Sequence, residues 1–516
     1  SATPSKKGPK MRTAIPPSVL PKERVETRIG PVELVHGAPT AATTTSLYDN
    51  LDFVRGVDAF LSTLPGASLV AMRRGLRQAG IDGNDVVGVF ERRMDAHSLF
   101  LTPNTESVYA MTWLDLRGGA FVVDSPPNTL GILDDFFFRY VADLGNAGPD
   151  EGKGGLFLFV PPMYEGQISE LYFNYVSRTF GNWLLWRGFA VNGDPAPAVQ
   201  SFRNHVQIYP LEFEISDDEI EAMEAFEITP EIDEPGDAAA LEEEVLPDDA
   251  VRFVDLSGKP MNTISSSDFG FFEEIDELVQ EELPEALGPE LLALLASAGI
   301  QKGTKFAPDA ESRSRLAEAA AVANATARAL AFRPRDETAY LYEDSAWYRP
   351  FIGNSYDFVS RGVRLTDART MFFYVATGTT PAMVTAKIGK GSQYALAATD
   401  DNGNYLDGSK SYRLKLPPNI PAKQFWSIVV YDPQTRSMLQ TPHSATPSLS
   451  SDTGTVAQGA DGSTTIYFGP TPPPGRETNW IQTVPGKGWF TILRIYSPLQ
   501  PYFDKSWQIG EIELVK

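Results

Sequence analysis

The last quarter of the chain is a series of short strand-like segments separated by turn dipeptides. Three runs concentrate β-branched and aromatic residues, at 424–432 (QFWSIVVYD), 463–469 (STTIYFG) and 489–498 (WFTILRIYSP). Dipeptides such as Asn402-Gly403 and Asp461-Gly462 have the composition that tight turns require. Because several short strands follow one another with no long helix among them, this region is predicted to form a sandwich or jelly roll rather than a parallel sheet.

A second β-rich region is predicted at about residues 95–210. Segments such as SVYAMTWLDL and GGLFLFVPP alternate with turn clusters, and the segment 134–144 (DDFFFRYVADL) is read as one apolar strand. Before this region, residues 51–64 and 68–79 carry apolar side chains at helical spacing. Pro65-Gly66 separates these two segments, so they are predicted to form a helical hairpin.

The part between the two β-rich regions differs in composition. Residues 212–250 are dominated by Asp and Glu, and such blocks of like charge are typical of solvated linkers or surface helices. The order of these acids does not match a helix–loop–helix calcium site. Three helices are predicted beyond it, at 269–281, 284–298 and 309–332.

The predicted fold class is therefore mainly β with α additions, as two β-sandwich or jelly-roll modules joined by a helical, acidic middle region. A chain of 516 residues exceeds the size at which a single core usually stops growing, so several domains are expected. The predicted organisation is a flexible leader at 1–44, a helical hairpin with a β module at 45–210, an acidic and helical connector at 211–335, and a C-terminal β module at 336–516.

The composition argues against several classes of function. The formal net charge of −23 makes nucleic acid a poor partner. The absence of cysteine excludes disulfides and thiol nucleophiles, and no apolar run reaches the ~20 residues of a membrane-spanning helix, so membrane insertion is not expected. No phosphate-binding, dinucleotide-binding or nucleophile-elbow motif is found. Neither a metal site nor a cofactor is predicted, because the chain has only four histidines and they stand far apart, at His36, His97, His205 and His443.

Carboxylates near an arginine are the first candidates for chemistry. Glu106 begins a predicted strand, and Asp134 and Asp135 open the next apolar segment, which contains Arg139. A charge inside an apolar strand is costly unless it is paired, so Arg139 is expected to meet Glu106, Asp134 or Asp143. The cluster is either a structural ion-pair network or a carboxylate pair for acid–base hydrolysis, as in glycosidases.

Aromatic residues of the last quarter are the second candidates. Tyr431, Trp480 and Trp489 either form a platform on which sugar rings stack or fill the core of the β module. The polar residues at 400–407 alternate like calcium ligands, but the glycine that follows Asn402 favours a hairpin turn.

Long blocks of the sequence resemble a bacterial family in which a DUF1254 domain precedes a DUF1214 domain. The N-terminal resemblance includes YDNLDFVRGVDAFL (48–61) and LFLTPNTESVYAMTWLDL (99–116). The C-terminal resemblance includes the segment 404–441, with QFWSIVVYDPQTRSMLQT, and NWIQTVPGKGWFTILRIYSPLQPYFDKSW (479–507). The family commonly has Asp-Thr where this chain has Glu106-Ser107. The resemblance implies β-rich, jelly-roll-like domains, self-association and export, but it supplies no settled substrate.

The leading hypothesis is a hydrolase that acts on a glycan or a similar polar substrate. Glu106 with Asp134 or Asp135 would supply the acid and the base, and Asn104, Tyr109 and Arg139 would position the substrate. The alternative is a non-catalytic protein, either a glycan-binding protein or an oligomeric scaffold, that uses the aromatic residues of the C-terminal module. A small-molecule or glycan ligand and a homo-oligomer are expected. A periplasmic or secreted location is expected, and a cytoplasmic one is left open.

Overall fold

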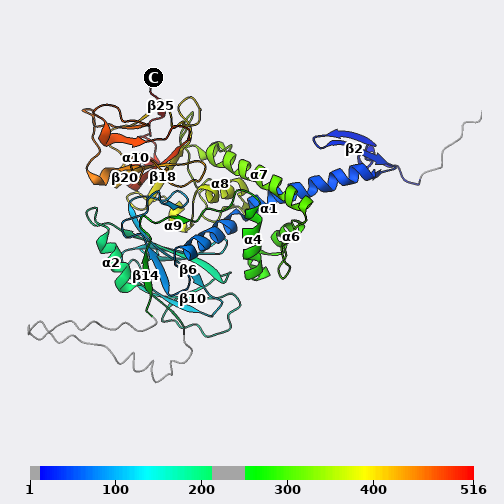
Figure 1. Ribbon diagram of the computed structural model, residues 1–516, viewed down its shortest axis with the longest axis horizontal. Helices are drawn as coiled ribbons and strands as arrows, with labels where there is room; N and C mark the ends of the chain where they lie inside the picture. The colour runs from blue at the N-terminus through cyan, green and yellow to red at the C-terminus, as the bar shows by residue number, and fades with distance from the viewer. Residues whose placement is uncertain (1–11, 212–249) are drawn as a thin grey trace, which may run out of the picture.

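The computed structural model describes residues 12–211 and 250–516. Most of the acidic segment 212–250 and the first part of the predicted leader therefore lie outside the described residues. The described chain is mainly β with helices, as the sequence predicted, and its strands form two two-sheet sandwiches (Figure 1). Within these residues, no helix has the length and apolar character needed to cross a membrane.

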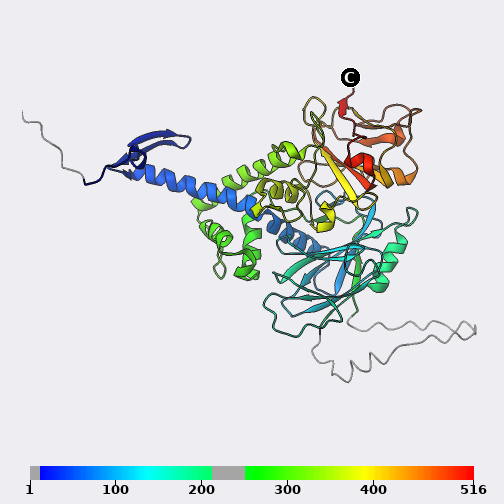
Figure 2. The same cartoon turned by 180° about the vertical axis from the view of Figure 1, so that it is seen from behind.

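The chain begins with a small sheet attached to a long helix that projects away from the rest of the molecule (Figures 1 and 2). The elements are η1 (Pro17–Val19), β1 (Arg24–Thr27), β2 (Gly30–Val35), β3 (Ala38–Pro39) and α1 (Ala41–Gln78). The predicted helical hairpin is wrong, because α1 continues through Pro65 as one helix of 38 residues. Gly66 lies at a close contact, where an added Cβ would come within 2.8 Å of Leu278 and 3.0 Å of Phe137. Burial on both sides of this turn offsets the roughly 3 kcal/mol that an internal proline costs a helix.

The first sandwich packs a six-stranded sheet against a four-stranded sheet. The six-stranded sheet has the order β14-β4-β6-β12-β8-β9, and its strands are β4 (Val86–Val89), β6 (Ser107–Asp115), β8 (Leu130–Asp135), β9 (Tyr140–Gly145), β12 (Gly181–Phe189) and β14 (Arg252–Asp255). The four-stranded sheet has the order β11-β10-β7-β13, and its strands are β7 (Phe121–Ser125), β10 (Gly155–Val160), β11 (Phe173–Val176) and β13 (Gln207–Pro210). Leu184 and Trp186 of β12 pack against Phe157 and Phe159 of β10 in the core between the two sheets. The remaining elements are α2 (Ala196–His205) and the short parallel pair β5 (Ser98–Leu99) and β15 (Met261–Asn262).

The segment predicted as one strand at 134–144 is two antiparallel strands. Strand β8 ends at Asp135, β9 begins at Tyr140, and Phe138 between them has a φ of 53°. The Asp135 carboxylate accepts backbone hydrogen bonds from Phe137 (2.8 Å) and Arg139 (3.0 Å). An aspartate that holds the backbone in this way stabilises a turn, which is why the apolar run reverses here.

Helices flank the two sandwiches. They are α4 (Gly270–Glu281), α5 (Pro284–Leu287), α6 (Pro289–Ser297), α7 (Ala310–Phe332), η2 (Glu337–Ala339), α8 (Thr366–Val375) and α9 (Pro381–Val384), with the hairpin of β16 (Val359–Ser360) and β17 (Val363–Arg364) before α8. The first and third predicted helices are confirmed as α4 and α7. The second divides into α5 and α6 at Gly288, whose φ of 82° ends the first helix.

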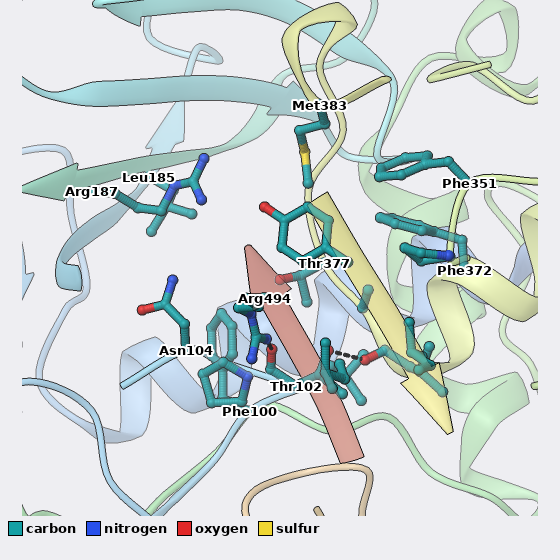
Figure 3. A pocket seen from close by; sticks show the side chains of 18 of the residues that line it. Phe100, Thr102, Asn104, Leu185, Arg187, Phe351, Phe372, Thr377, Met383 and Arg494 are labelled. Atoms are coloured by element: carbon teal, nitrogen blue, oxygen red, sulfur yellow. Dashed lines mark hydrogen bonds between the residues drawn. The ribbon is translucent and has the colours of Figure 1, made fainter. Parts of the chain in front are cut away.

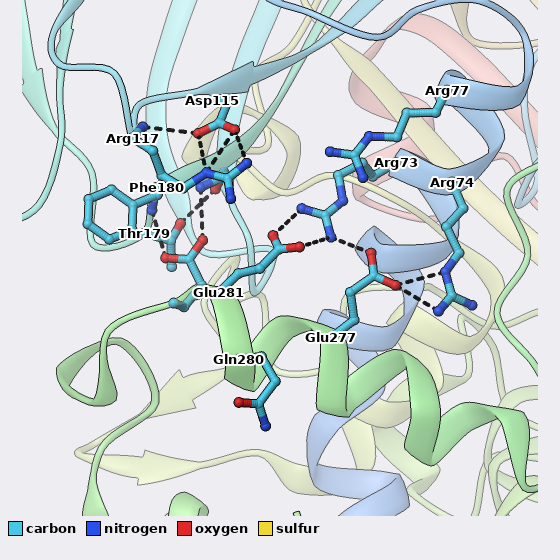
Figure 4. A network of polar contacts seen from close by, with 12 residues as sticks. Arg73, Arg74, Arg77, Asp115, Arg117, Thr179, Phe180, Glu277, Gln280 and Glu281 are labelled. Carbon is cyan, nitrogen blue, oxygen red and sulfur yellow. Dashed lines mark hydrogen bonds and ion pairs between the residues drawn. The ribbon is translucent and has the colours of Figure 1, made fainter. Parts of the chain in front are cut away.

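A buried arginine fastens α4 to α1 (Figure 4). Arg73 is only 1% exposed and lies over the rings of Trp113 and Phe136. Its guanidinium forms ion pairs with Glu277 and Glu281, which keep about a quarter of their side chains exposed. The helical region is therefore fixed to the first sandwich by a desolvated charge as well as by apolar packing.

The second sandwich contains the predicted C-terminal strands. One sheet has the order β18-β24-β20-β21, with β18 (Ser392–Ala397), β20 (Ala422–Tyr431), β21 (Ser448–Ser450) and β24 (Phe490–Pro498). The other has the order β23-β22-β19-β25, with β19 (Tyr412–Leu416), β22 (Thr464–Gly469), β23 (Trp480–Gln482) and β25 (Ile512–Leu514). Ile428 and Leu493 of the first sheet pack against Leu414 and Ile466 of the second. The short helices of this part are η3 (Ser451–Thr453), η4 (Glu477–Asn479) and α10 (Gln500–Phe503).

One sheet of each sandwich also contributes its outer face to a third core between them. Successive side chains of a strand point to opposite faces of the sheet. The side chains of Leu185 of β12 and Ile492 of β24 therefore point away from the cores of their own sandwiches. Both belong to the large cluster that includes residues of α1, α4, α7 and α8. The described residues therefore contain three large apolar cores, and the central one joins the two sandwiches and the helices.

Candidate functional site

A cavity lies in the central core, where the two sandwiches and the helical region meet (Figure 3). It holds about 760 Å³ of space between side chains, part of it open to solvent. The first sandwich supplies Tyr109, Leu185 and Arg187, and the second supplies Tyr394 and Arg494. The loop before β6 and the segment around α8 and α9 complete the wall, with Phe100, Thr102, Pro103, Asn104, Phe351, Phe372, Val375, Ala376, Thr377 and Met383. Clefts at domain interfaces are common ligand sites.

Arg187 is the charged group most available to a ligand in this cavity. It lies near the end of β12, on the face that leaves the first sandwich core, and it is half-buried. Its hydrogen-bonding neighbour is the hydroxyl of Tyr394, and among the described residues no carboxylate forms an ion pair with it. A guanidinium has five N–H donors, so most of the donors of Arg187 have no acceptor among the described residues. Figure 3 shows the side chain directed into the open space of the cavity.

Arg494 brings a second guanidinium from the opposite sandwich. It is 4% exposed and donates to the Tyr431 hydroxyl (2.8 Å) and to the Thr102 carbonyl (2.9 Å). Burial lowers the pKa of Arg494, but the oxygens of Tyr431 and Glu106 contribute to a larger opposite effect that raises it above its ordinary value. Arg494 therefore stays charged, held mainly by neutral oxygen acceptors.

The loop before β6 is held in place by the second sandwich. The Thr102 N–H donates to the Arg436 carbonyl (2.9 Å), and Tyr431 donates its hydroxyl proton to the Pro103 carbonyl (2.6 Å). Thr102 has a φ of 36°, which is strained for a β-branched residue. Strain of this kind persists only where surrounding contacts impose it, and it is concentrated at functional sites.

Asn104 and Tyr109 both line the cavity, as expected for substrate-positioning residues. The Asn104 side-chain oxygen accepts from the N–H groups of Glu106 (3.2 Å) and Ser107 (2.9 Å), so it mainly shapes the loop. The Tyr109 hydroxyl accepts from the Asn104 N–H (3.2 Å), and burial raises its pKa. Tyr109 therefore keeps its proton at neutral pH and can donate it to a ligand.

Glu106 lies behind this wall rather than in it. Its carboxylate accepts hydrogen bonds from the hydroxyls of Thr105 (2.7 Å) and Tyr496 (2.8 Å). Burial and the nearby Glu106 carboxylate raise the pKa of Tyr496 well above its ordinary value. Glu106 is thus held by neutral donors at the edge of the second sandwich.

The structure does not bring the predicted acid and base together. Strand β12 lies between β6 and β8. Ser107, the neighbour of Glu106, pairs with Phe189 of β12, whereas Asp134 pairs with Trp183 of β12. Phe189 and Trp183 are six residues apart along β12, which is roughly 20 Å at the usual rise per residue. Glycosidase carboxylates stand about 5–10 Å apart, so neither Asp134 nor Asp135 can act with Glu106 on one bond.

Asp134, Asp135 and Arg139 lie elsewhere in the first sandwich. Arg139 is paired with Asp135 through Nε and Oδ2 (2.7 Å), not with the three acids predicted for it. The reason is the turn after β8, which places Arg139 over the aspartate that shapes the turn. Asp134 is fully buried and accepts from the Thr379 N–H (2.8 Å), and burial raises its pKa well above the ordinary value.

The aromatic residues predicted as a sugar platform are buried in the C-terminal module. Trp489 packs on Phe468 in the sandwich core, and Trp480 is 8% exposed, with its indole N–H donated to the Gly469 carbonyl (3.0 Å). Tyr431 is fully buried behind Arg494. The core interpretation of these residues is therefore the one that fits, and no stacking surface is formed by them.

The polar residues at 400–407 form a turn, as the glycine indicated. The Asp400 carboxylate accepts from the N–H groups of Asn402 (3.0 Å) and Asn404 (2.9 Å). Across the part of the chain that the structure describes, no group of three or more acidic or histidine side chains is arranged to hold a metal ion.

Arg187, Arg494 and Tyr394 are the site residues that the sequence analysis missed. The signal that drew attention to Arg139, a charge inside an apolar strand, is also present in NWLLWRGF and in WFTILRIYSP. Arg187 and Arg494 carry that signal without an acid nearby in sequence.

Models of two families match the chain. The model described as "Protein of unknown function (DUF1254)" matches residues 85–210, and the one described as "Protein of unknown function (DUF1214)" matches residues 391–500. A comparison with curated proteins gave no match.

Two solved structures are similar to the chain. The VPA0106 protein from Vibrio parahaemolyticus is 19% identical, with 90% of this chain and 100% of that chain covered and a TM-score of 0.49. An uncharacterized protein from Burkholderia cenocepacia is 11% identical, with 92% and 97% covered and a TM-score of 0.36. Both family models match in order along the sequence, which confirms the resemblance to the two-domain family that joins a DUF1254 domain to a DUF1214 domain.

Proposed function

We propose that the central cavity binds a small organic anion, namely a carboxylate attached to an apolar body. The observation that carries this proposal is Arg187, a half-buried guanidinium that faces the cavity and forms no ion pair among the described residues, with the Asp143 carboxylate acting on it only from a distance. A protein with a net charge of −23 has many acids with which to neutralise an arginine. Leaving one guanidinium unpaired in a cavity suits an anionic ligand, because the charge is costly to desolvate unless something pairs with it.

The rest of the lining supports a ligand with an apolar body. Phe100, Phe351 and Phe372 offer aromatic surface, and Leu185 and Met383 offer aliphatic surface. Arg494 and the hydroxyls of Tyr109 and Tyr394 surround the end at which a carboxylate would lie. A few polar groups that fix orientation within a mainly apolar wall are typical of small-molecule sites.

Binding without hydrolysis is the function that this lining supports best. Among the described residues that line the cavity, none is aspartate, glutamate, histidine or serine. Hydrolysis of a polar substrate stays a prediction. It would now depend on Glu106 acting alone through Tyr496, so Glu106→Gln is the variant that tests it. A glycan is less well suited than an organic acid, because few hydrogen-bonding side chains are present to meet its hydroxyls.

The test is isothermal titration calorimetry with benzoate and octanoate, each compared with its neutral amide. We expect the acids to bind and the amides to bind much more weakly. Arg187→Ala should weaken acid binding by about tenfold to hundredfold, as expected for the loss of a charge-assisted hydrogen bond. The matched control is Arg413→Ala, which removes an exposed arginine paired with Glu513 on the second sandwich.

Two results would refute this function. One is the absence of binding by either acid at millimolar concentration. The other is equal binding by wild type and Arg187→Ala, which would place the acid outside the cavity.

We also propose that the projecting arm mediates self-association. Tyr48, Leu51 and Val54 follow helical spacing in the first half of α1, on a face that leaves all three exposed. Leu51→Asp should lower the mass measured by light scattering if this face is covered by a second copy, whereas Val322→Asp, at an exposed site on α7, should not. An unchanged mass for Leu51→Asp would contradict this assignment. The family resemblance also favours export, so we expect the protein in the periplasmic or secreted fraction.

A further inference from the structure

A second cavity lies on the other side of the segment that walls the first one. Phe372 lines the central cavity, whereas the next residue, Phe373, lines the second. The second cavity holds about 890 Å³ of space, part of it open to solvent, between the turn after β8, helix α6 and the segment from Tyr356 to Arg369. We refer to it as the arginine cavity.

Four arginines from separate parts of the chain line the arginine cavity. Arg139 comes from the turn after β8 and Arg178 from the loop before β12, while Arg364 ends β17 and Arg369 lies on α8. Arg139, Arg178 and the pair of Arg364 and Arg369 are far apart in the sequence, so only the fold brings their guanidinium groups to one cavity.

Most of this positive charge has no protein counter-charge. Arg139 alone is ion-paired, with Asp135. Arg364 donates to the carbonyls of Asp357 and Phe358. Among the described residues, Arg178 forms no ion pair, and the one hydrogen bond of the Arg369 side chain is a long contact of 3.5 Å to the Ser62 carbonyl. The four guanidiniums thus meet the carboxylates of Asp135 and Asp357, and the Asp58 carboxylate also acts on Arg369.

Two guanidinium nitrogens at this site are buried without any hydrogen-bond partner. They are Nη2 of Arg139 and Nε of Arg369. Buried N–H donors nearly always have a hydrogen-bond acceptor, so two without one indicate that an acceptor binds here. Burial, and after it the neighbouring Arg364, lower the pKa of Arg369 to about 10, which reflects the cost of desolvating this charge beside another cation. An anion between the arginines would remove that cost.

From this geometry we infer that the arginine cavity binds a small polyvalent oxyanion with phosphate-type oxygens. Guanidinium forks match the oxygens of such groups, and several of them are needed to balance more than one negative charge. The aromatic side chains of the wall, Phe137, Phe138, Tyr140, Tyr356, Phe358 and Phe373, surround the charges with apolar surface, which strengthens the attraction. This ligand differs from the monovalent organic acid proposed for the central cavity, and neither proposal depends on the other.

The experiment is titration calorimetry of the full-length protein with pyrophosphate at low ionic strength. We expect Arg364→Ala and Arg178→Ala each to weaken binding on the order of tenfold. Both side chains are exposed, so both variants should fold, which circular dichroism checks. Arg413→Ala and Arg187→Ala are the controls, and both should bind as wild type does. Added salt should weaken the interaction, because the charges are reached from solvent.

Two further anions, citrate and acetate, test which kind of ligand the arginine cavity prefers. Citrate tests whether a polycarboxylate substitutes for phosphate-type oxygens, and acetate tests whether a single charge suffices. Pyrophosphate binding that exceeds citrate and acetate binding supports the inference. Absence of pyrophosphate binding, equal binding of acetate, or a loss caused by Arg187→Ala rather than by Arg364→Ala would overturn it.

Discussion

Glu282 should make the stability of the protein fall as the pH rises. It directly follows α4, and its two carboxylate oxygens accept hydrogen bonds from the N–H groups of Phe180 (2.7 Å) and Gly181 (2.9 Å). Burial outweighs these hydrogen bonds and raises the pKa of Glu282 to about 7, from an ordinary value of 4.5. The folded protein therefore holds this proton more tightly than the unfolded chain does. Stability from this group is complete below pH 4.5 and is lost as the pH rises through about 7.

Glu282→Gln removes this titration with little change of size. A difference between pKa values of about 7 and 4.5 corresponds to about 3 kcal/mol of unfolding free energy. Because Gln has one acceptor oxygen instead of two, the variant should be about 1 kcal/mol less stable than the wild type at low pH. Above neutrality the order should reverse, and the variant should be about 2 kcal/mol more stable.

Urea unfolding of the two proteins at matched pH values measures this difference directly. The other titrating groups, including Glu274, whose pKa is also raised to about 7 by burial, are present in both proteins and cancel in the comparison. A free-energy difference between wild type and Glu282→Gln that stays constant across this pH range would refute the reasoning. It would mean that Glu282 ionises in the folded protein as it does in the unfolded chain.

Three further substitutions test the packing around the site. Arg73→Met should lower the unfolding free energy by about 3 kcal/mol in urea, because Glu281 loses its counter-charge and Glu277 keeps only Arg74; a loss below about 1 kcal/mol would contradict this. Asp134→Asn should change stability at neutral pH by less than about 1 kcal/mol, because burial raises the pKa of Asp134 and the neutral form of its carboxyl is favoured; a large loss in thermal unfolding would show that it is charged. Tyr496→Phe should cost about 1–2 kcal/mol through the hydrogen bond to Glu106, yet leave octanoate binding intact, and a loss of binding would assign Tyr496 to the site.

Local patterns were enough to predict most of the secondary structure. The runs at 424–432, 463–469 and 489–498 correspond to β20, β22 and β24, because turn residues and strand residues alternate over short distances. The predicted break of the helix at Pro65 was wrong, because tertiary packing decides whether a proline ends a helix. The close contact of Gly66 with Leu278, which keeps α1 continuous, involves residues far apart in sequence.

The site was less accessible to sequence reasoning. The loop with Asn104 and Tyr109 was recognised, because turn residues precede a strand there, and both residues line the cavity. The pairing of Glu106 with Asp134 failed because nearness in sequence says nothing of the roughly 20 Å between their levels on β12. Arg187 and Arg494 belong to different sandwiches, and only the packing of the two sheets shows that they face one cavity.

The central claim is that Arg187 and Arg494 hold the carboxylate of a small amphipathic acid between the two sandwiches. A crystal structure of the protein grown with octanoate tests it most directly. The claim predicts density for the carboxylate within hydrogen-bond distance of the Arg187 guanidinium, with the alkyl chain against Phe351 and Phe372. An empty central cavity, or an octanoate whose carboxylate points away from Arg187, would contradict it.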